Sequence, residues 1–196
     1  MFRRAILIAF CLSAVFNTAT AGRRGLAVLD TIIKVSVSSS HSYKPINVVI
    51  NKTGNMAKII YSIFDDIDSE ALIADTAFAN ADKLFRAGKP EPAMALANKY
   101  HVYLYDTLNV SAPDLNHQID LLLRSYDKEL TSDFKNRVVL DGTRVGVEII
   151  TTGGTRKISA NSPTTDYQPI LYSFLQQLFS TYRQNTKKNI LQGNGY

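Results

Sequence analysis

Residues 137–160 read RVVLDGTRVGVEIITTGGTRKISA, and this stretch decides the fold. Apolar residues at 145, 147 and 149 alternate with small or polar ones, which is the pattern of a strand with one buried face. Asp141-Gly142 precedes this run and Gly153-Gly154 follows it, and both pairs are typical of tight turns between antiparallel strands. The stretch therefore predicts three consecutive antiparallel strands, at 137–140, 143–151 and 155–160.

A second hairpin is predicted near the N-terminus. Residues 45–51 (PINVVIN) and 56–64 (MAKIIYSIF) are both strand-like, and Lys52-Thr53-Gly54-Asn55 supplies turn residues between them. Residues 26–37 (LAVLDTIIKVSV) are rich in β-branched side chains and predict a further strand before this hairpin.

Helical patterns fill the middle and the end of the chain. Ser69 caps a predicted helix over about 70–87, with Gly88 as its stop. After Pro90-Glu91-Pro92, helical spacing from Ala93 to Leu108 favours a second helix, although 101–106 (HVYLYD) also alternates like a strand. Two further helices are predicted over about 112–131 and after Pro169, the second with an apolar face running from Leu171 to Tyr182.

Strands at both ends with helices between them predict an α+β fold. Its sheet would be antiparallel, built from the N-terminal and C-terminal hairpins and packed against three or four helices, because no strand–helix–strand alternation supports a parallel sheet. Residues 22–185 are interpreted as a single domain and 186–196 as a polar, frayed tail.

The first 21 residues have the pattern of a secretory signal peptide. Arg3 and Arg4 precede a run of about twelve mainly apolar residues, too short to span a bilayer, and Ala19-Thr20-Ala21 is a small-x-small cleavage site before Gly22. The sequence thus predicts an exported protein, periplasmic or secreted. Removal of this segment takes away Cys11, the one cysteine, and leaves 175 residues with twenty basic and seventeen acidic side chains, net +3.

The rest of the sequence carries no motif that would indicate catalysis, a metal site or a cofactor. The three histidines, at 41, 101 and 117, have no zinc-ligand spacing, and no Gly-x-Ser-x-Gly or phosphate-binding loop occurs. Asp66 to Glu70 resembles the start of a calcium loop, but Ala71 and Ala77 stand where glycine and glutamate are needed. A pair of carboxylates for glycoside hydrolysis is an alternative that only the fold can decide.

Charge is segregated along the chain. Residues 65–82 carry six acidic side chains and no basic one, whereas 134–196 carry a net charge of +5. Arg144 is predicted on the exposed face of its strand, and Arg156 and Lys157 of the next strand are candidates to join it in a basic, partner-binding patch.

These features together predict an exported protein that binds another macromolecule. The partner would be a protein or an anionic component of the cell envelope rather than nucleic acid, and an inhibitor or immunity-type protein is one such form. Two alternatives remain: a hydrolase of an envelope polymer with an Asp/Glu acid–base pair, and a structural envelope component that self-associates through sheet edges.

Overall fold

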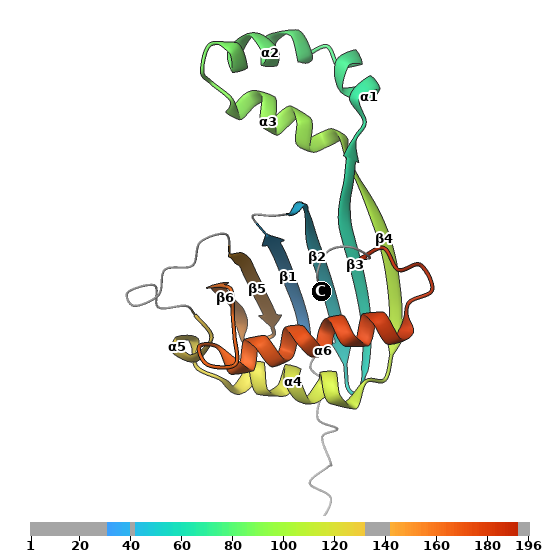
Figure 1. The fold of residues 1–196 in the computed structure, drawn as a ribbon, viewed down its shortest axis with the longest axis vertical. Coiled ribbons are helices and arrows are strands. Elements are labelled where there is room, and N and C mark those ends of the chain that lie inside the picture. The colour runs from blue at the N-terminus through green and yellow to red at the C-terminus, as the bar shows by residue number, and fades with distance from the viewer. Residues whose placement is uncertain (1–30, 40–41, 132–141, 192–196) are drawn as a thin grey trace, which may run out of the picture.

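The computed structural model describes residues 31–39, 42–131 and 142–191 (Figure 1). The signal segment with Ala19, Ala21 and Gly22, the start of the first predicted strand, and the predicted strand 137–140 lie outside the described residues. The elements in chain order are β1 Thr31–Ser39, β2 Ser42–Thr53, β3 Met56–Ile67, α1 Ser69–Ala74, α2 Phe78–Arg86, α3 Glu91–Ala97, η1 Asn98–Tyr100, β4 His101–Val110, α4 Pro113–Arg124, α5 Asp127–Leu130, β5 Thr143–Thr151, β6 Gly154–Asn161 and α6 Pro169–Asn185.

The fold is α+β, as predicted, with one six-stranded antiparallel sheet in the order β4-β3-β2-β1-β5-β6. The hairpins β2–β3 and β5–β6 are both present, and β1 joins them by pairing with β2 on one side and β5 on the other. The described residues form six α-helices, more than the three or four predicted, because two of the predicted helices are broken into shorter ones.

Helices α4 and α6 cover one face of the sheet (Figure 1). Alternate residues of β1, β2, β3 and β5 point into this layer and are buried, as the period of two requires. Phe174, Leu178 and Tyr182 of α6 pack onto them, and the Tyr61 hydroxyl of β3 donates a hydrogen bond of 2.9 Å to the Leu178 carbonyl. The core therefore lies on one side of the sheet, and the other face is free to carry function.

The predicted second helix, from Ala93 to Leu108, is present in its first part as α3 and η1 and is wrong from His101 onward. Helical structure ends at Tyr100, and residues 101–110 form strand β4, which pairs with β3 along its length. The physical reason is that β3 has a free edge, and the alternation of residues 101–110 (HVYLYDTLNV) places Asp106 and Leu108 on the buried side there. Leu104 and Leu108 fit helical spacing, but they equally fit the alternation of a strand.

The predicted helices 70–87 and 112–131 are each interrupted. The first breaks between α1 and α2, where the Asp75 carboxylate accepts hydrogen bonds from the Ala77 backbone N–H and the Tyr100 hydroxyl. Its N-cap is Asp68 rather than Ser69, since the Asp68 carboxylate accepts from the Ala71 N–H. The second breaks after Arg124 and restarts as α5.

The structure places α1, α2, α3 and η1, residues 69–100, away from the sheet. We call this unit the head. It stands at the end of β3 and β4, which extend past the other strands (Figure 1). Gly88 follows the end of α2 and has a φ of +77°, a conformation that favours glycine. The turn leads into α3, so the head is a helical hairpin of α2 and α3, preceded by the short α1.

Residues 186–191, the first part of the predicted tail, pack against the body. The Thr186 hydroxyl donates to the buried Asp106 carboxylate, the Tyr182 hydroxyl accepts from the Ile190 N–H at 2.9 Å, and the Leu191 side chain is buried. Residues 192–196 lie outside the described part of the chain.

Candidate binding surface on the sheet

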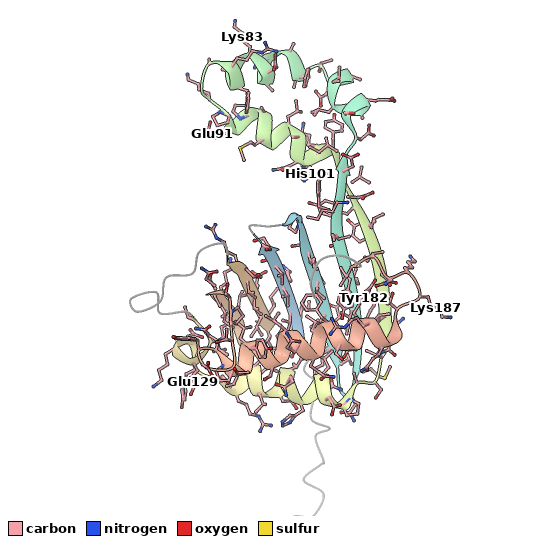
Figure 2. All side chains as sticks on the ribbon, viewed as in Figure 1. Lys83, Glu91, His101, Glu129, Tyr182 and Lys187 are labelled. Atoms are coloured by element: carbon pink, nitrogen blue, oxygen red, sulfur yellow. The ribbon has the colours of Figure 1, made fainter. Side chains whose placement is uncertain are left out.

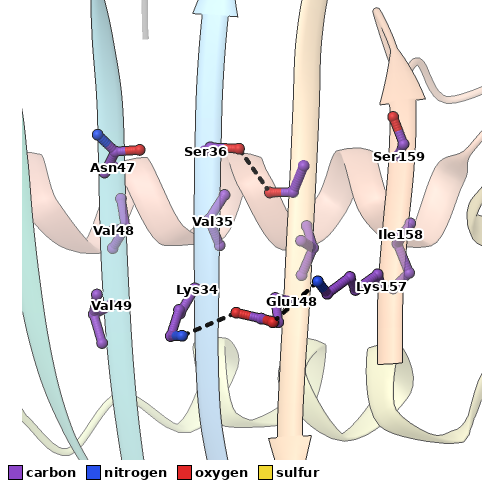
Figure 3. Close-up of a pocket in the computed structure, with 12 residues that line it drawn as sticks. Lys34, Val35, Ser36, Asn47, Val48, Val49, Glu148, Lys157, Ile158 and Ser159 are labelled. Atoms are coloured by element: carbon purple, nitrogen blue, oxygen red, sulfur yellow. Dashed lines mark hydrogen bonds and ion pairs between the residues drawn. The ribbon is translucent and has the colours of Figure 1, made fainter. Parts of the chain in front are cut away.

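The face of the sheet opposite α4 and α6, which we call the open face, is hollowed across its middle. The hollow has a volume of about 530 Å³, and Figure 3 shows its lining. Strand register explains the shape: Asn47, Ser36, Gly146 and Ser159 stand side by side on β2, β1, β5 and β6 and form a row of small residues across the sheet. Small polar side chains leave room above the backbone and offer hydrogen-bonding groups to whatever enters.

Gly146 is needed at the floor of the hollow because of a close approach. A Cβ atom at this position would lie 2.6 Å from the Ser36 Oγ of the neighbouring strand. The Ser36 hydroxyl itself points toward the Gly146 carbonyl, as Figure 3 shows. The glycine therefore leaves room for the Ser36 hydroxyl and keeps the depth of the hollow.

One acidic side chain at the side of the hollow joins two lysines. Lys34 Nζ lies 2.9 Å from Glu148 Oε2, and Lys157 Nζ lies 3.7 Å from Glu148 Oε1 (Figure 3). The hydrogen bond from Lys34 lowers the pKa of the Glu148 carboxyl below its ordinary value, with smaller contributions from the charges of both lysines. Glu148 is thus held as a carboxylate, and it links β1, β5 and β6 across the open face.

Two further cations stand on the open face without a partner among the described residues. Arg144 lies on β5, two residues before Gly146, and Lys58 lies on β3. Both side chains are exposed. With Lys34 and Lys157 the described open face carries four basic side chains against one acidic side chain, Glu148. The lysines in the hollow share Glu148, whereas Arg144 and Lys58 lie outside its lining. The face as a whole has an excess of positive charge, which attracts ligands of the opposite sign.

Of the three residues predicted for a basic patch, the structure brings Arg144 and Lys157 to the open face. Arg156 lies on the other face, because it stands opposite the buried Ile149 in the β5–β6 register. Its guanidinium binds the Asp127 carboxylate and the backbone carbonyls of Leu122 and Ser125 at the junction of α4 and α5. Alternation could have shown this, since residues 156, 158 and 160 share one face and the last two are buried.

Sequence reasoning missed Lys34, Lys58 and Glu148 as members of the surface. Alternation within each strand places each of them on the solvent side. However, β1 becomes the neighbour of β5, and β3 joins the same sheet beyond β2, only through the order of the strands. No short-range signal in the sequence carries that order, so the surface could not be assembled before the fold.

The histidines do not form a common site. His101 packs in an aromatic cluster at the base of the head, with ring centroids 4.8 Å from Phe64 and 6.1 Å from Tyr103, and Figure 2 shows it there. His117 is exposed on α4, and His41 lies outside the described residues. Within the described part of the chain no three His, Cys, Asp or Glu side chains are grouped to hold a metal ion.

The head carries a second, apolar hollow of about 250 Å³ between α1, α2 and α3. Its lining is almost wholly carbon and includes Leu72, Phe78, Phe85 and Met94. Phe85 and Met94 are 56% and 60% exposed, which is high for side chains of this size. The chemistry of this hollow is therefore opposite to that of the open face.

Comparison of the chain with protein-family models, with curated proteins and with solved structures finds no match in any of the three. In the described residues no helix is both long enough and apolar enough to cross a bilayer.

Proposed function

We propose that this chain is an exported protein that binds an acidic macromolecular partner, a protein, on the open face of its sheet. The observation that carries the proposal is the combination of concave shape and charge: a hollow of about 530 Å³ lined by Lys34, Lys157 and Glu148, on a face that also carries Arg144 and Lys58 outside the hollow. An inhibitor or immunity-type protein, which blocks its target by covering it, uses a rigid surface of this kind. Export rests on the signal-peptide pattern of residues 1–21.

The rigidity of the surface supports binding. The row of small residues belongs to the central and C-terminal strands of the sheet, each backed by buried side chains on the other face. A preformed surface loses little conformational entropy when a partner binds, so more of the contact energy appears as affinity. The unpaired cations Arg144 and Lys58 would speed association with an acidic partner and make it sensitive to salt.

Hydrolysis is supported less well by the same surface. Glycoside hydrolases canonically use two carboxyl groups, one of them protonated to act as an acid. Among the described residues the hollow is lined by one carboxylate, Glu148, and the hydrogen bond from Lys34 lowers its pKa. A carboxyl group held ionised is a poor general acid, so binding is the role that we propose for this face.

Charge reversal of the open face tests this proposal. Protein captured from an envelope extract by the wild-type chain is identified and then assayed with the double variant Arg144→Glu and Lys58→Glu. The expected result is at least a tenfold loss of affinity, because two attractive contacts become repulsive, about 1.4 kcal/mol or more in total. The matched control is Arg183→Glu with Lys187→Glu, which reverses two exposed charges on the helix-covered side, one in the last turn of α6 and one just after this helix.

Equal loss of affinity in both double variants would mean that net charge, not this face, governs capture. Unchanged affinity in the Arg144→Glu and Lys58→Glu variant would overturn the proposal. The thermal midpoint of each variant shows that the fold is retained.

A further inference from the structure

Strand β4 forms one edge of the sheet and has the composition of a strand that pairs readily. In the sheet order it has β3 on one side and, in the described part of the chain, no strand on the other. Its sequence, HVYLYDTLNV, is rich in aromatic and β-branched residues and contains no lysine, arginine or proline. The side chains of Val102, Leu104 and Tyr105 are 41%, 41% and 57% exposed. An apolar edge of this kind is a template for pairing with another chain unless something blocks it.

The segment that follows α6 lies along this edge, and we call its residues 186–191 the strap. Figure 1 shows the strap beside β4, as the red coil that leaves the end of α6. Two of its side chains bind β4 directly. The Thr186 hydroxyl donates a hydrogen bond to the Asp106 carboxylate, and Lys188 Nζ donates one of 3.2 Å to the Tyr105 carbonyl. The strap therefore covers part of the edge of β4.

The covered part includes backbone groups that an added strand would use. The Thr107 N–H donates to the Asp106 carboxylate at 2.9 Å, so it is not donated to β3 and faces the outer side of the strand. Alternate residues of a strand direct their backbone groups to the same side, so the Tyr105 carbonyl, which Lys188 binds, also faces outward. The Asp106 carboxylate that caps Thr107 is itself bound by Thr186. A strand that pairs here must displace both contacts.

The strap is held in a defined conformation at the edge. Its Thr186 hydroxyl accepts hydrogen bonds from the Lys188 N–H and the Asn189 N–H, each at 3.1 Å. Asn189 has a φ of +49°, in the left-handed region that asparagine adopts more readily than most residues. Beyond this turn the Leu191 side chain is buried in the core. Anchors on both sides of Lys188 therefore keep its ammonium group beside β4.

From these contacts we infer that the strap is an edge guard, which prevents β4 from pairing with the β4 of a second copy of this chain. Two identical edge strands can pair antiparallel about a two-fold axis. The charges of β4 do not oppose this pairing, because its one acidic side chain, Asp106, is buried and it has no lysine or arginine. Natural proteins block such edges with a lysine or a covering loop, and the strap supplies both. This inference is independent of the proposed function of the open face.

Sedimentation velocity of variants that release the strap tests the inference. Thr186→Val with Lys188→Ala removes both side-chain contacts with β4 and keeps Leu191, whereas a chain that ends at Asn185 lacks the strap altogether. Both are expected to dimerise with a dissociation constant at least tenfold below that of the wild type, and the shortened chain more tightly than the double variant. Circular dichroism and the thermal midpoint establish that each variant is folded. If the shortened chain does not fold, the double variant decides the test.

A lysine placed on β4 distinguishes strand pairing from aggregation through an exposed core. Tyr105→Lys is expected to return both released variants to the monomer, because a lysine on an edge strand opposes pairing. The matched control is Tyr167→Lys, which replaces a tyrosine of similar exposure, 56%, in the loop before α6 and should leave the dimer unchanged.

Three results would overturn the inference. The first is a released variant that is folded and remains monomeric at every concentration. The second is a dimer of a released variant that persists after Tyr105→Lys. The third is a wild type that is already dimeric and becomes monomeric with Tyr105→Lys, since the strap would then guard nothing. None of these results bears on binding at the open face, which is measured with the partner protein.

Discussion

Arg156 shows how one side chain can hold several elements together. Its guanidinium reaches from β6 to two carbonyls at the C-terminal end of α4 and to the Asp127 carboxylate of α5. Carbonyls at a helix end have no partner within the helix, and a planar guanidinium can satisfy two of them at once. The residue that the sequence offered as part of a binding patch therefore has a structural role.

Arg156→Lys is expected to lower the free energy of unfolding by roughly 1.5–3 kcal/mol, because a lysine ammonium cannot bind all three groups in the same geometry. Urea denaturation measures the change. Lys157→Arg, at the neighbouring position with its side chain on the other face, is the matched control and should change stability little. A loss confined to the control would show that the network at Arg156 adds nothing.

Gly146 is expected to be sensitive to the addition of a single methyl group. In Gly146→Ala the new Cβ would meet the Ser36 Oγ at 2.6 Å, so the Ser36 side chain must turn away and lose its contact with the Gly146 carbonyl, at a cost of about 0.5–1.5 kcal/mol. Ser36→Ala removes the oxygen that causes the clash. In a double-mutant cycle Gly146→Ala should cost clearly less in the Ser36→Ala background, and strictly additive effects would contradict the contact.

At the scale of elements, sequence patterns predicted strands where one buried face imposes alternation. The strands β2, β3, β5 and β6 and the helix α6 follow from local periodicity and turn residues, and the structure has them close to their expected places. Strand β4 could not be predicted from local periodicity, because the residues HVYLYD fit both a helix and a strand. Pairing with the free edge of β3 decides between the two. Alternation placed Arg144 correctly on the open face. Arg156 and Lys157 were both offered as its companions, although adjacent residues of a strand point to opposite faces, and Lys34 and Lys58 come from strands distant in sequence.

The bridge between β1, β5 and β6 through Glu148 should make stability depend on pH. Because the folded-state pKa of Glu148 is lowered, the bridge contributes above the pKa of the unfolded chain and is lost as pH falls through the folded pKa. The wild type should exceed Glu148→Gln in thermal midpoint near pH 7, and the gap should close in acid. A gap that is constant from neutral to acidic pH would contradict the assignment.

At the scale of the whole molecule, the chain separates its surfaces by chemistry. The body presents a polar, basic concave face on one side of the sheet and buries its core on the other, while the head presents an apolar hollow at a distance from both.

Site-specific photo-crosslinking tests the central claim, that the open face is the binding surface, most directly. A photoreactive phenylalanine derivative is placed at Ser159, an exposed residue in the lining of the hollow, and separately at Gln184, exposed near the end of α6 on the helix-covered side. In cells that produce the protein, irradiation is expected to yield a discrete adduct from position 159 that disappears with Arg144→Glu and Lys58→Glu, and none from position 184. An adduct from position 184 with none from position 159 would contradict the account.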